Sequence, residues 1–115
     1  MRINRTIPSI ARLSIAAGVT VAVGDAIGIS SGEAVLSDKD AQISVAGLAK
    51  SVQGSIVYIQ TEGKFANADA GNNFWLGTNG ELVNSPPSTG IVQQIAKRLD
   101  SQNILIVIDK TVIIL

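Results

Sequence analysis

Residues 78–85 read TNGELVNS, and residues 30–37 read SSGEAVLS. Both stretches contain the order Gly-Glu-x-Val-x-Ser, and residue 30 aligns with residue 78, at an offset of 48. A polar residue followed by glycine between two strand-forming segments is typical of a two-residue β-turn, in which the glycine takes a positive φ. Each stretch therefore predicts a β-hairpin whose glutamate begins the return strand and faces solvent.

Gly32-Glu33 and Gly80-Glu81 could also supply a pair of carboxylates for chemistry. A catalytic carboxylate needs a partner base, a nucleophile or a metal ion, and nothing in the sequence accompanies these two. The chain has no histidine and no cysteine. The commonest general base and the commonest zinc ligands are therefore missing, and we expect neither an enzyme nor a metal or cofactor site.

Short apolar segments separated by turn residues fill the chain from residue 19 onward. They include VTVAVG at 19–24, ISVAGLAKSV at 43–52, SIVYIQT at 55–61 and NILIVID at 103–109. Alternation of apolar and polar residues and an abundance of β-branched residues favour strands over helices. Aromatic residues make up only 3% of the chain, so we expect a thin aliphatic core.

One segment, residues 91–99, fits two structures. IVQQIAKRL places apolar residues at helical spacing, which by itself favours a helix. A shift of about 47 residues, however, overlays this segment on ISVAGLAKSV, whose central glycine and β-branched residues make a poor helix. If the two halves of the chain are equivalent, residues 91–99 are a strand, and this is the interpretation that we adopt.

The sequence thus predicts an all-β fold, a small barrel or sandwich of two tandem hairpin-rich repeats of about 47 residues each. The repeats would cover residues 19–65 and 66–115 within one β domain, 19–115. Residues 1–18 carry three arginines before the first acidic residue, Asp25. Pro8 and the isolated isoleucines of this segment indicate an extended N-terminal arm that packs on the body of the domain or on a neighbouring subunit.

Two short patterns suggest ligands but fit poorly. Asn67, Asp69 and Gly71 are faintly similar to a calcium loop, but the glycine comes one place early and no glutamate closes the loop. Gly63-Lys64 lacks the upstream glycine of a phosphate-binding loop. A polar loop and an ordinary turn explain these residues better.

Contacts with other proteins are the more plausible role for several residues. Phe74 and Trp75 are adjacent, so in a strand they face opposite ways, and the one outside the core can anchor a partner. The arginines of the arm are too few for a nucleic-acid footprint and suit an acidic protein surface better. The candidate assembly contacts are Arg2, Ile3, Arg5, Ile7, Ile10, Arg12 and Trp75.

Residues 71–108 resemble a module of structural proteins in tailed double-stranded DNA phages. The matching pieces are Trp75-Leu76-Gly77, Gly80, Leu82, Pro86-Pro87, Gly90, Val92-Gln93 and Ile95. Ala96 departs from the pattern, because members of the family often have glycine there. With GDAIGISSG and IVYIQTEGKF at the front, the resemblance extends over about residues 19–112 and is similar in particular to the capsid cement, or decoration, proteins.

The resemblance implies a β-rich, commonly trimeric virion protein without catalytic residues. It would sit as a homotrimer on the outer surface of the capsid, after assembly in the host cytoplasm, and would stabilise contacts between major capsid proteins. A tail-fibre, baseplate or adaptor module is the alternative, because the same module occurs in those proteins. The expected partners are the major capsid protein and further copies of this chain, with no membrane and no direct nucleic-acid contact.

Overall fold

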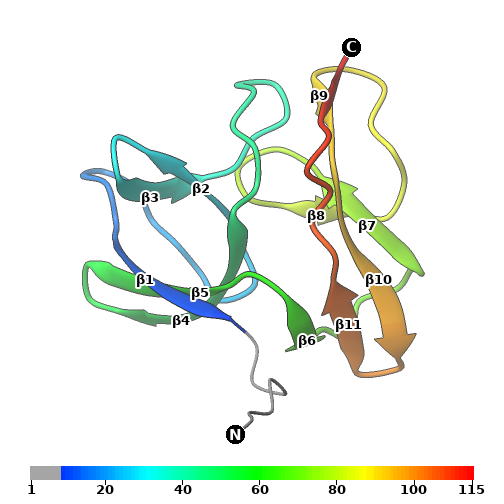
Figure 1. Ribbon diagram of the computed structural model, residues 1–115, viewed down its shortest axis with the longest axis horizontal. Helices are drawn as coiled ribbons and strands as arrows, with labels where there is room; N and C mark the ends of the chain where they lie inside the picture. The colour runs from blue at the N-terminus through cyan, green and yellow to red at the C-terminus, as the bar shows by residue number, and fades with distance from the viewer. Residues whose placement is uncertain (1–8) are drawn as a thin grey trace, which may run out of the picture.

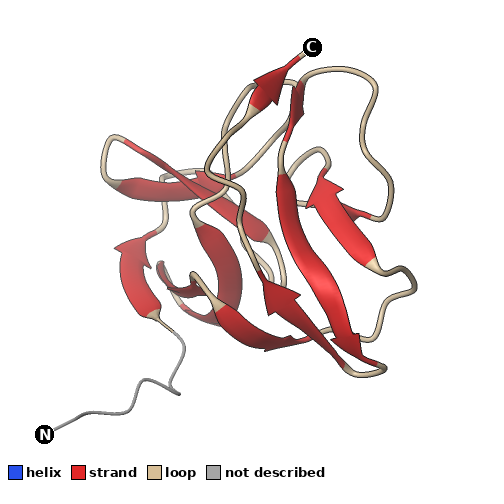
Figure 2. Ribbon diagram, turned by 45° about the vertical axis from the view of Figure 1, so that its right-hand side comes forward, coloured by secondary structure: helices blue, strands red, loops and turns tan. Residues whose placement is uncertain are grey.

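Strands make up all of the regular structure in the computed structural model, which describes residues 9–115 (Figures 1 and 2). The strands form two five-stranded sheets and one two-stranded sheet. Every pair of named strands is antiparallel. The prediction of an all-β fold is confirmed, and residues 9–115 contain no helix.

The first sheet has the strand order β1-β5-β4-β2-β3. Its strands are β1 (Ile10–Ser14), β2 (Ala26–Ser30), β3 (Glu33–Leu36), β4 (Gly47–Gln53) and β5 (Ile56–Gln60). After β1 the chain reaches the opposite edge of the sheet, where the Ala16 N–H donates to the Ala34 carbonyl at 3.0 Å. Ile15 forms a parallel bridge with Ala34, so this sheet closes on itself as a small barrel.

The second sheet has the order β6-β11-β10-β7-β8. Its strands are β6 (Gly63–Ala66), β7 (Asn73–Leu76), β8 (Leu82–Val83), β10 (Gln94–Asp100) and β11 (Asn103–Ile106). The remaining strands, β9 (Ile91–Val92) and β12 (Ile113–Ile114), pair with each other. The C-terminal strand therefore lies beside the segment that leads into β10.

The two large sheets connect their strands in the same order. Strands β2 and β7 begin at residues 26 and 73, and β4 and β10 begin at residues 47 and 94, each pair 47 residues apart. Each sheet also takes one strand, β1 or β6, from the chain that precedes its hairpin. The tandem repetition of the sequence itself stays a prediction, but the two halves share one topology.

Segment 91–99 is extended, as we expected from the comparison of the two halves. Ile91, Gln93 and Ile95 are buried in alternation, which is the period of a strand rather than of a helix. The pairing of β10 with β7 shifts register between Gln94 and Ala96, so the inward and outward positions change there. This irregularity explains why Ile95 and Ala96 are both buried, whereas Leu99, which completed the helical spacing in the sequence, is exposed.

Two apolar clusters form the core. Ile27, Ala49, Val57 and Ile59 fill the first barrel together with Ala34. The second cluster crosses between the halves, because Ala26, Val45 and Leu48 of the first half pack with buried residues of the second. Those residues are Phe65, Phe74, Leu76, Ile91, Ile95, Ala96, Ile104 and Ile106. The halves therefore share a core.

The expected N-terminal arm is in part a strand of the body. Residues 10–14 are β1, and Ile10 pairs with Gln60 while Ser14 pairs with Ile56. Leu13 and Ile15 pack against the core of the first barrel. From Ile10 onward, the segment thus packs on the domain itself, one of the two alternatives that we considered for it. Residues 1–8 lie outside the described residues.

Candidate assembly surface

The turn Thr78-Asn79-Gly80 joins the second half of the molecule to the first. The Gly80 N–H donates to the Ser37 carbonyl at 2.7 Å, and the Gly80 carbonyl accepts from the Ala26 N–H at 2.8 Å. Gly80 has a φ of +79°, and a Cβ there would lie 3.0 Å from the Leu36 side chain. The glycine therefore serves both the turn and the close approach of the two halves, whereas the sequence suggested only the turn.

We call this contact between the turn at residues 78–80 and the first half the joint. Lys39 extends the joint to the segment before β9. Its N–H donates to the Gly77 carbonyl at 3.0 Å, and its carbonyl accepts from the Ile91 N–H at 2.9 Å. Its ammonium group donates to the Thr89 hydroxyl at 2.9 Å and to Asp40 Oδ1 at 2.9 Å. Gly90 packs directly on the Lys39 backbone. The segment after the first hairpin, residues 37–39, which we call the connector, is thus bonded to the second half at each of its residues.

The carboxylate of Asp38 links the connector to the turn at residues 78–80 by accepting backbone hydrogen bonds from that turn and from the residues just after the connector. One oxygen accepts from the Ala41 N–H at 3.0 Å and from the Asp40 N–H at 2.8 Å, and the other accepts from the Asn79 N–H at 3.0 Å. These bonds, led by the one from Ala41, lower the pKa of Asp38, although partial burial works in the opposite direction. The ionised carboxylate therefore stabilises the folded state.

Replacing Asp38 with alanine is expected to lower the free energy of unfolding by about 1 to 2 kcal/mol at neutral pH, because three backbone N–H groups lose a charged acceptor. The folded-state pKa lies below the unfolded value of about 3.9, so this stabilisation is present above that value. It is lost as the pH falls through the lower, folded-state pKa. Denaturant unfolding at about pH 7 and about pH 2 should show the difference between wild type and variant shrinking at acid pH.

Glu33 provides a matched control, because it is an exposed acidic residue at the start of β3. Glu33→Ala should change the free energy of unfolding by less than about 0.5 kcal/mol. An Asp38→Ala deficit that is equally large at both pH values would contradict a role for the ionised carboxylate.

Gln93 is buried at the centre of the shared core and bonds the two halves at a second place. Its Oε1 accepts from the Val45 N–H at 2.8 Å, and its Nε2 donates to the Asp109 carbonyl at 2.9 Å. The side chain is 3% exposed. A polar residue this deeply buried must have partners, and here they come from two segments that are far apart in the sequence, one in each half of the chain. Its only signal in the sequence is an amide side chain within an otherwise apolar segment.

Arg98 holds the loop that was weakly similar to a calcium site. Its guanidinium donates to the carbonyls of Asn67 at 2.6 Å and Gly71 at 3.0 Å, and also to the carbonyl of Asp69. The same group lies 5.3 Å from the centroid of the Phe74 ring. A cation contributed by the chain thus already occupies the inside of loop 67–71, which favours the polar-loop interpretation over a calcium site.

Arg98→Ala is expected to lower the free energy of unfolding by about 2 kcal/mol, because several backbone carbonyls lose a charged donor. Amide hydrogen exchange in residues 67–72 should become at least about tenfold faster, because the guanidinium is what links the loop to the sheet. Lys97→Ala removes an exposed neighbouring cation and should leave both quantities nearly unchanged. Unchanged exchange in the loop of the Arg98 variant would mean that the loop is held by other contacts.

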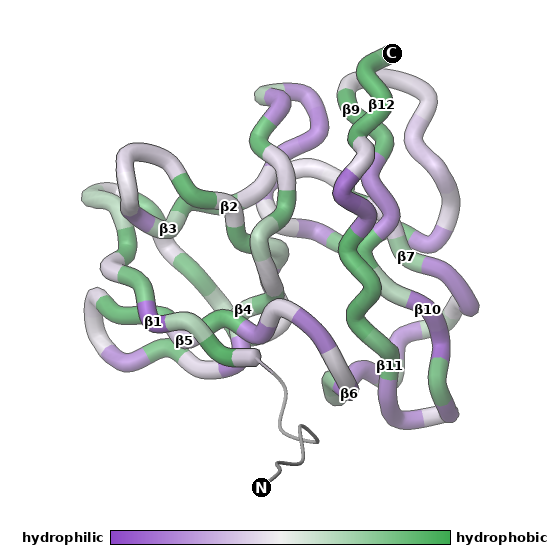
Figure 3. The backbone as a smooth tube through the Cα atoms, in the orientation of Figure 1, coloured by the Kyte–Doolittle hydropathy of each residue, from purple (hydrophilic) through white to green (hydrophobic). Residues whose placement is uncertain are grey.

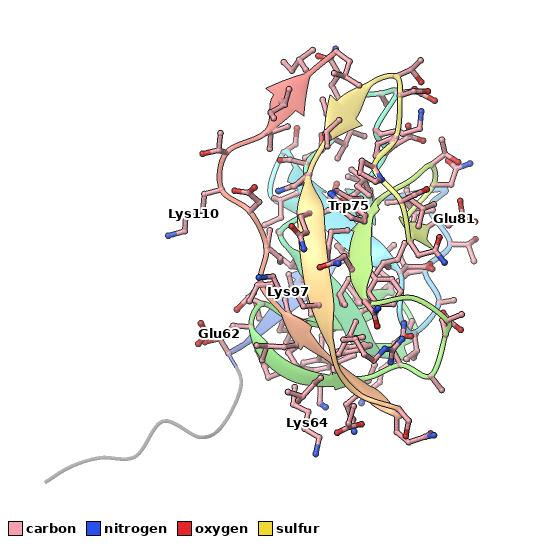
Figure 4. All side chains as sticks on the ribbon, turned by 90° about the vertical axis from the view of Figure 1, so that its right-hand side faces the viewer. Glu62, Lys64, Trp75, Glu81, Lys97 and Lys110 are labelled. Atoms are coloured by element: carbon pink, nitrogen blue, oxygen red, sulfur yellow. The ribbon has the colours of Figure 1, made fainter. Side chains whose placement is uncertain are left out.

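Phe74 and Trp75 face opposite ways, as expected. Phe74 is 2% exposed and packs in the shared core, whereas Trp75 is half-buried and pairs across the sheet with Gln94 and Val83. Trp75 lies between Lys97 and Glu81 on the face shown in Figure 4. Trp75 is therefore on the outer side of the second sheet, where a partner can reach it.

Of the other contact residues predicted from the sequence, the structure describes only Ile10 and Arg12. Ile10 is 43% exposed and Arg12 is exposed, both on the outer side of β1. Arg2, Ile3, Arg5 and Ile7 lie outside the described residues. Ile10 and Arg12 lie in the first half and Trp75 in the second, so these candidates are spread over both halves.

Several exposed apolar residues were not among the predicted contacts. Ile29 at the end of β2 is 53% exposed, and Ile113, Ile114 and Leu115 are 57%, 64% and 62% exposed. Figure 3 shows the C-terminal segment as a continuous hydrophobic stretch beside β9. Contiguous exposed apolar residues are typical of surfaces that contact other molecules. Periodicity could not reveal them, because these residues lie at strand ends.

Residues 9–115 contain no group of three or more acidic side chains placed to hold a metal ion. In the same part of the chain, no helix is present that could cross a membrane. No protein-family model, no curated protein and no solved structure matches this chain. The function is therefore inferred from the contacts described above and from the sequence pattern of residues 71–108.

Proposed function

We propose that this chain is a structural virion protein of a tailed phage, a capsid cement protein. It would bind the outer head surface as a homotrimer and stabilise the contacts between major capsid proteins. One observation carries the proposal. Four positions of the resembling pattern, Gly77, Gly80, Gly90 and Gln93, all make contacts in or beside the joint between the halves. The pattern therefore belongs to the construction of the fold, which supports a shared architecture.

The distribution of exposed apolar residues supports a contact role. Ile10, Ile29 and the residues of β12 are exposed, and covering them with a partner would be favourable because it removes apolar surface from water. A cement protein gains its effect from many modest contacts that symmetry multiplies over the particle. Trp75 provides a larger anchor on a separate face.

Binding to expanded capsids tests the proposal. Purified protein is mixed with expanded, DNA-free capsids of the phage that carries this chain, prepared without it, and the bound copies are counted after sedimentation. We expect hundreds of copies per particle and greater resistance of the capsid to heat. A few copies at the tail would instead favour the tail-fibre, baseplate or adaptor alternative. A protein that stays monomeric and does not bind would overturn the cement proposal.

Removal of residues 1–8 tests the contribution of Arg2, Ile3, Arg5 and Ile7 to this binding. This deletion leaves β1 complete, because β1 begins at Ile10. We expect weaker binding to capsids with an unchanged free energy of unfolding. Binding equal to that of the full chain would show that the first eight residues are not the anchor, and Trp75→Ala would then be the next variant to measure.

A further inference from the structure

The first hairpin ends in a turn with the same geometry as the turn of the joint. Ser31 and Gly32 have φ values of +52° and +77°, and Asn79 and Gly80 have φ values of +50° and +79°. These values belong to the same two-residue turn type. The two turns also occupy the same place in their sheets, since one connects β2 to β3 and the other connects β7 to β8.

The surroundings of the two turns differ completely. Around Gly80, a Cβ would meet Leu36, Ala26 and Asp25 of the first half, whereas around Gly32 it would meet no atom within 4 Å. The residue 47 positions before the buried Leu76 is Ile29. Leu76 is 0% exposed and Ile29 is 53% exposed. The first half therefore presents, uncovered, the same feature that the second half buries inside the molecule.

The direction of the joint explains this difference. In Figure 1 the turn between β2 and β3 points away from the second half, while the turn between β7 and β8 reaches toward the first. The joint thus brings together two different surfaces, a hairpin end and a connector. A contact between unlike surfaces leaves one copy of each surface unused at the two ends of the molecule.

We call residues Ile29–Gly32 the head. The connector of the second half corresponds to the segment around Lys39 and comprises residues 84–90, which continue into β9. Strand β12 covers β9, and the Leu115 N–H donates to the Gly90 carbonyl at 2.9 Å. We call residues 84–90 together with β12 the tail, and it lies at the upper right of Figure 1, whereas the head lies at the left.

The tail is not chemically identical to the connector that receives Gly80. At an offset of 48, Asp38 and Lys39 correspond to Pro86 and Pro87, and proline cannot donate a backbone N–H. The tail instead presents the exposed side chains of Ile113, Ile114 and Leu115. These suit the exposed Ile29 of a head, so we expect an apolar contact in place of the polar one.

We propose that copies of this chain associate head to tail, with residues 29–32 of one copy packed against residues 84–90 and β12 of the next. The occupant of each surface is a second copy, because the joint already pairs the corresponding surfaces within one chain. This inference deepens the proposed function by naming the surface through which copies meet. Head-to-tail association can be tested on protein free of capsids. Failure to bind capsids would therefore count against the cement function alone, and failure to self-associate would count against this inference alone.

Two single substitutions and their mixture test the proposal. Ile29→Glu places a charge on the head, and Ile114→Glu places one on the tail; both side chains are already exposed. Each variant alone should be monomeric by sedimentation equilibrium, with self-association weakened on the order of 30-fold or more relative to wild type. Mixed together, they should form a one-to-one pair and nothing larger, because one intact head then meets one intact tail.

The controls keep the outcome decisive. Val23→Glu changes an apolar residue that is 65% exposed and belongs to neither surface, so it should associate as wild type does. Ser30→Arg is a second head variant for use if Ile29→Glu does not fold, as judged by circular dichroism. A monomeric wild type, an Ile29→Glu variant that associates normally, or a mixture that stays monomeric would each overturn the proposal.

Discussion

Replacing Gly90 with alanine is expected to lower the free energy of unfolding by about 3 kcal/mol or more. Gly90 has a φ of +78°, which disfavours any side chain. The added Cβ would also collide with the Lys39 carbonyl oxygen and would lie 2.8 Å from the Lys39 carbonyl carbon. Both atoms are backbone, so the collision can be relieved only by separating the connector from the segment before β9.

Gly54→Ala is the matched control, because Gly54 has a φ of +62° and no atom within 4 Å of its would-be Cβ. It carries the conformational cost alone, which is about 1 kcal/mol. Chemical denaturation of both variants gives the difference, and the excess for Gly90 measures the close packing of the joint. Equal losses for the two variants would show that the joint can move apart freely.

Replacing Gln93 with methionine should lower the free energy of unfolding by about 2 to 4 kcal/mol. Methionine preserves most of the volume of the side chain but removes both hydrogen bonds. The Val45 N–H and the Asp109 carbonyl would then be left without their side-chain partner. Unfolding of the variant by urea, with wild type measured in parallel, checks the size of the effect.

Gln94→Met provides the comparison at the next position. Gln94 is half-buried, and its Nε2 donates to Asn73 Oδ1 at 3.1 Å on the outer face of the sheet. Solvent can replace that bond, so the expected loss is below about 1 kcal/mol. A Gln93 variant no less stable than the Gln94 variant would mean that the buried amide does not connect the two halves.

The parts of the fold set by local backbone chemistry were predictable. Ser31-Gly32 and Asn79-Gly80 form the expected turns, and Glu33 and Glu81 are exposed as expected. The difference between these turns could not be read from the sequence, because it depends on where the second hairpin packs. Two stretches of nearly identical pattern thus have opposite environments, and only the tertiary structure separates them.

Strand β1 shows why the beginning of the chain was harder. Residues 11–14 do alternate apolar and polar, but the run is short, and β1 is stabilised by pairing with β5, more than 40 residues away in the sequence. Arg98 was missed for a related reason. An arginine in a strand is usually solvated, and its role in holding loop 67–71 arises from backbone carbonyls, which leave no mark in the sequence.

Amide hydrogen exchange at Gly32 and Gly80 tests most directly whether one turn geometry is used both within and between copies. In the Ile29→Glu monomer, the Gly80 amide should be protected by its bond to Ser37, and the Gly32 amide should exchange rapidly. In assembled wild-type protein, both amides should be protected, Gly80 by its bond to Ser37 and Gly32 because the tail of the next copy covers it and excludes water. Rapid exchange of Gly32 in the assembled protein, or of Gly80 in the monomer, would contradict the account.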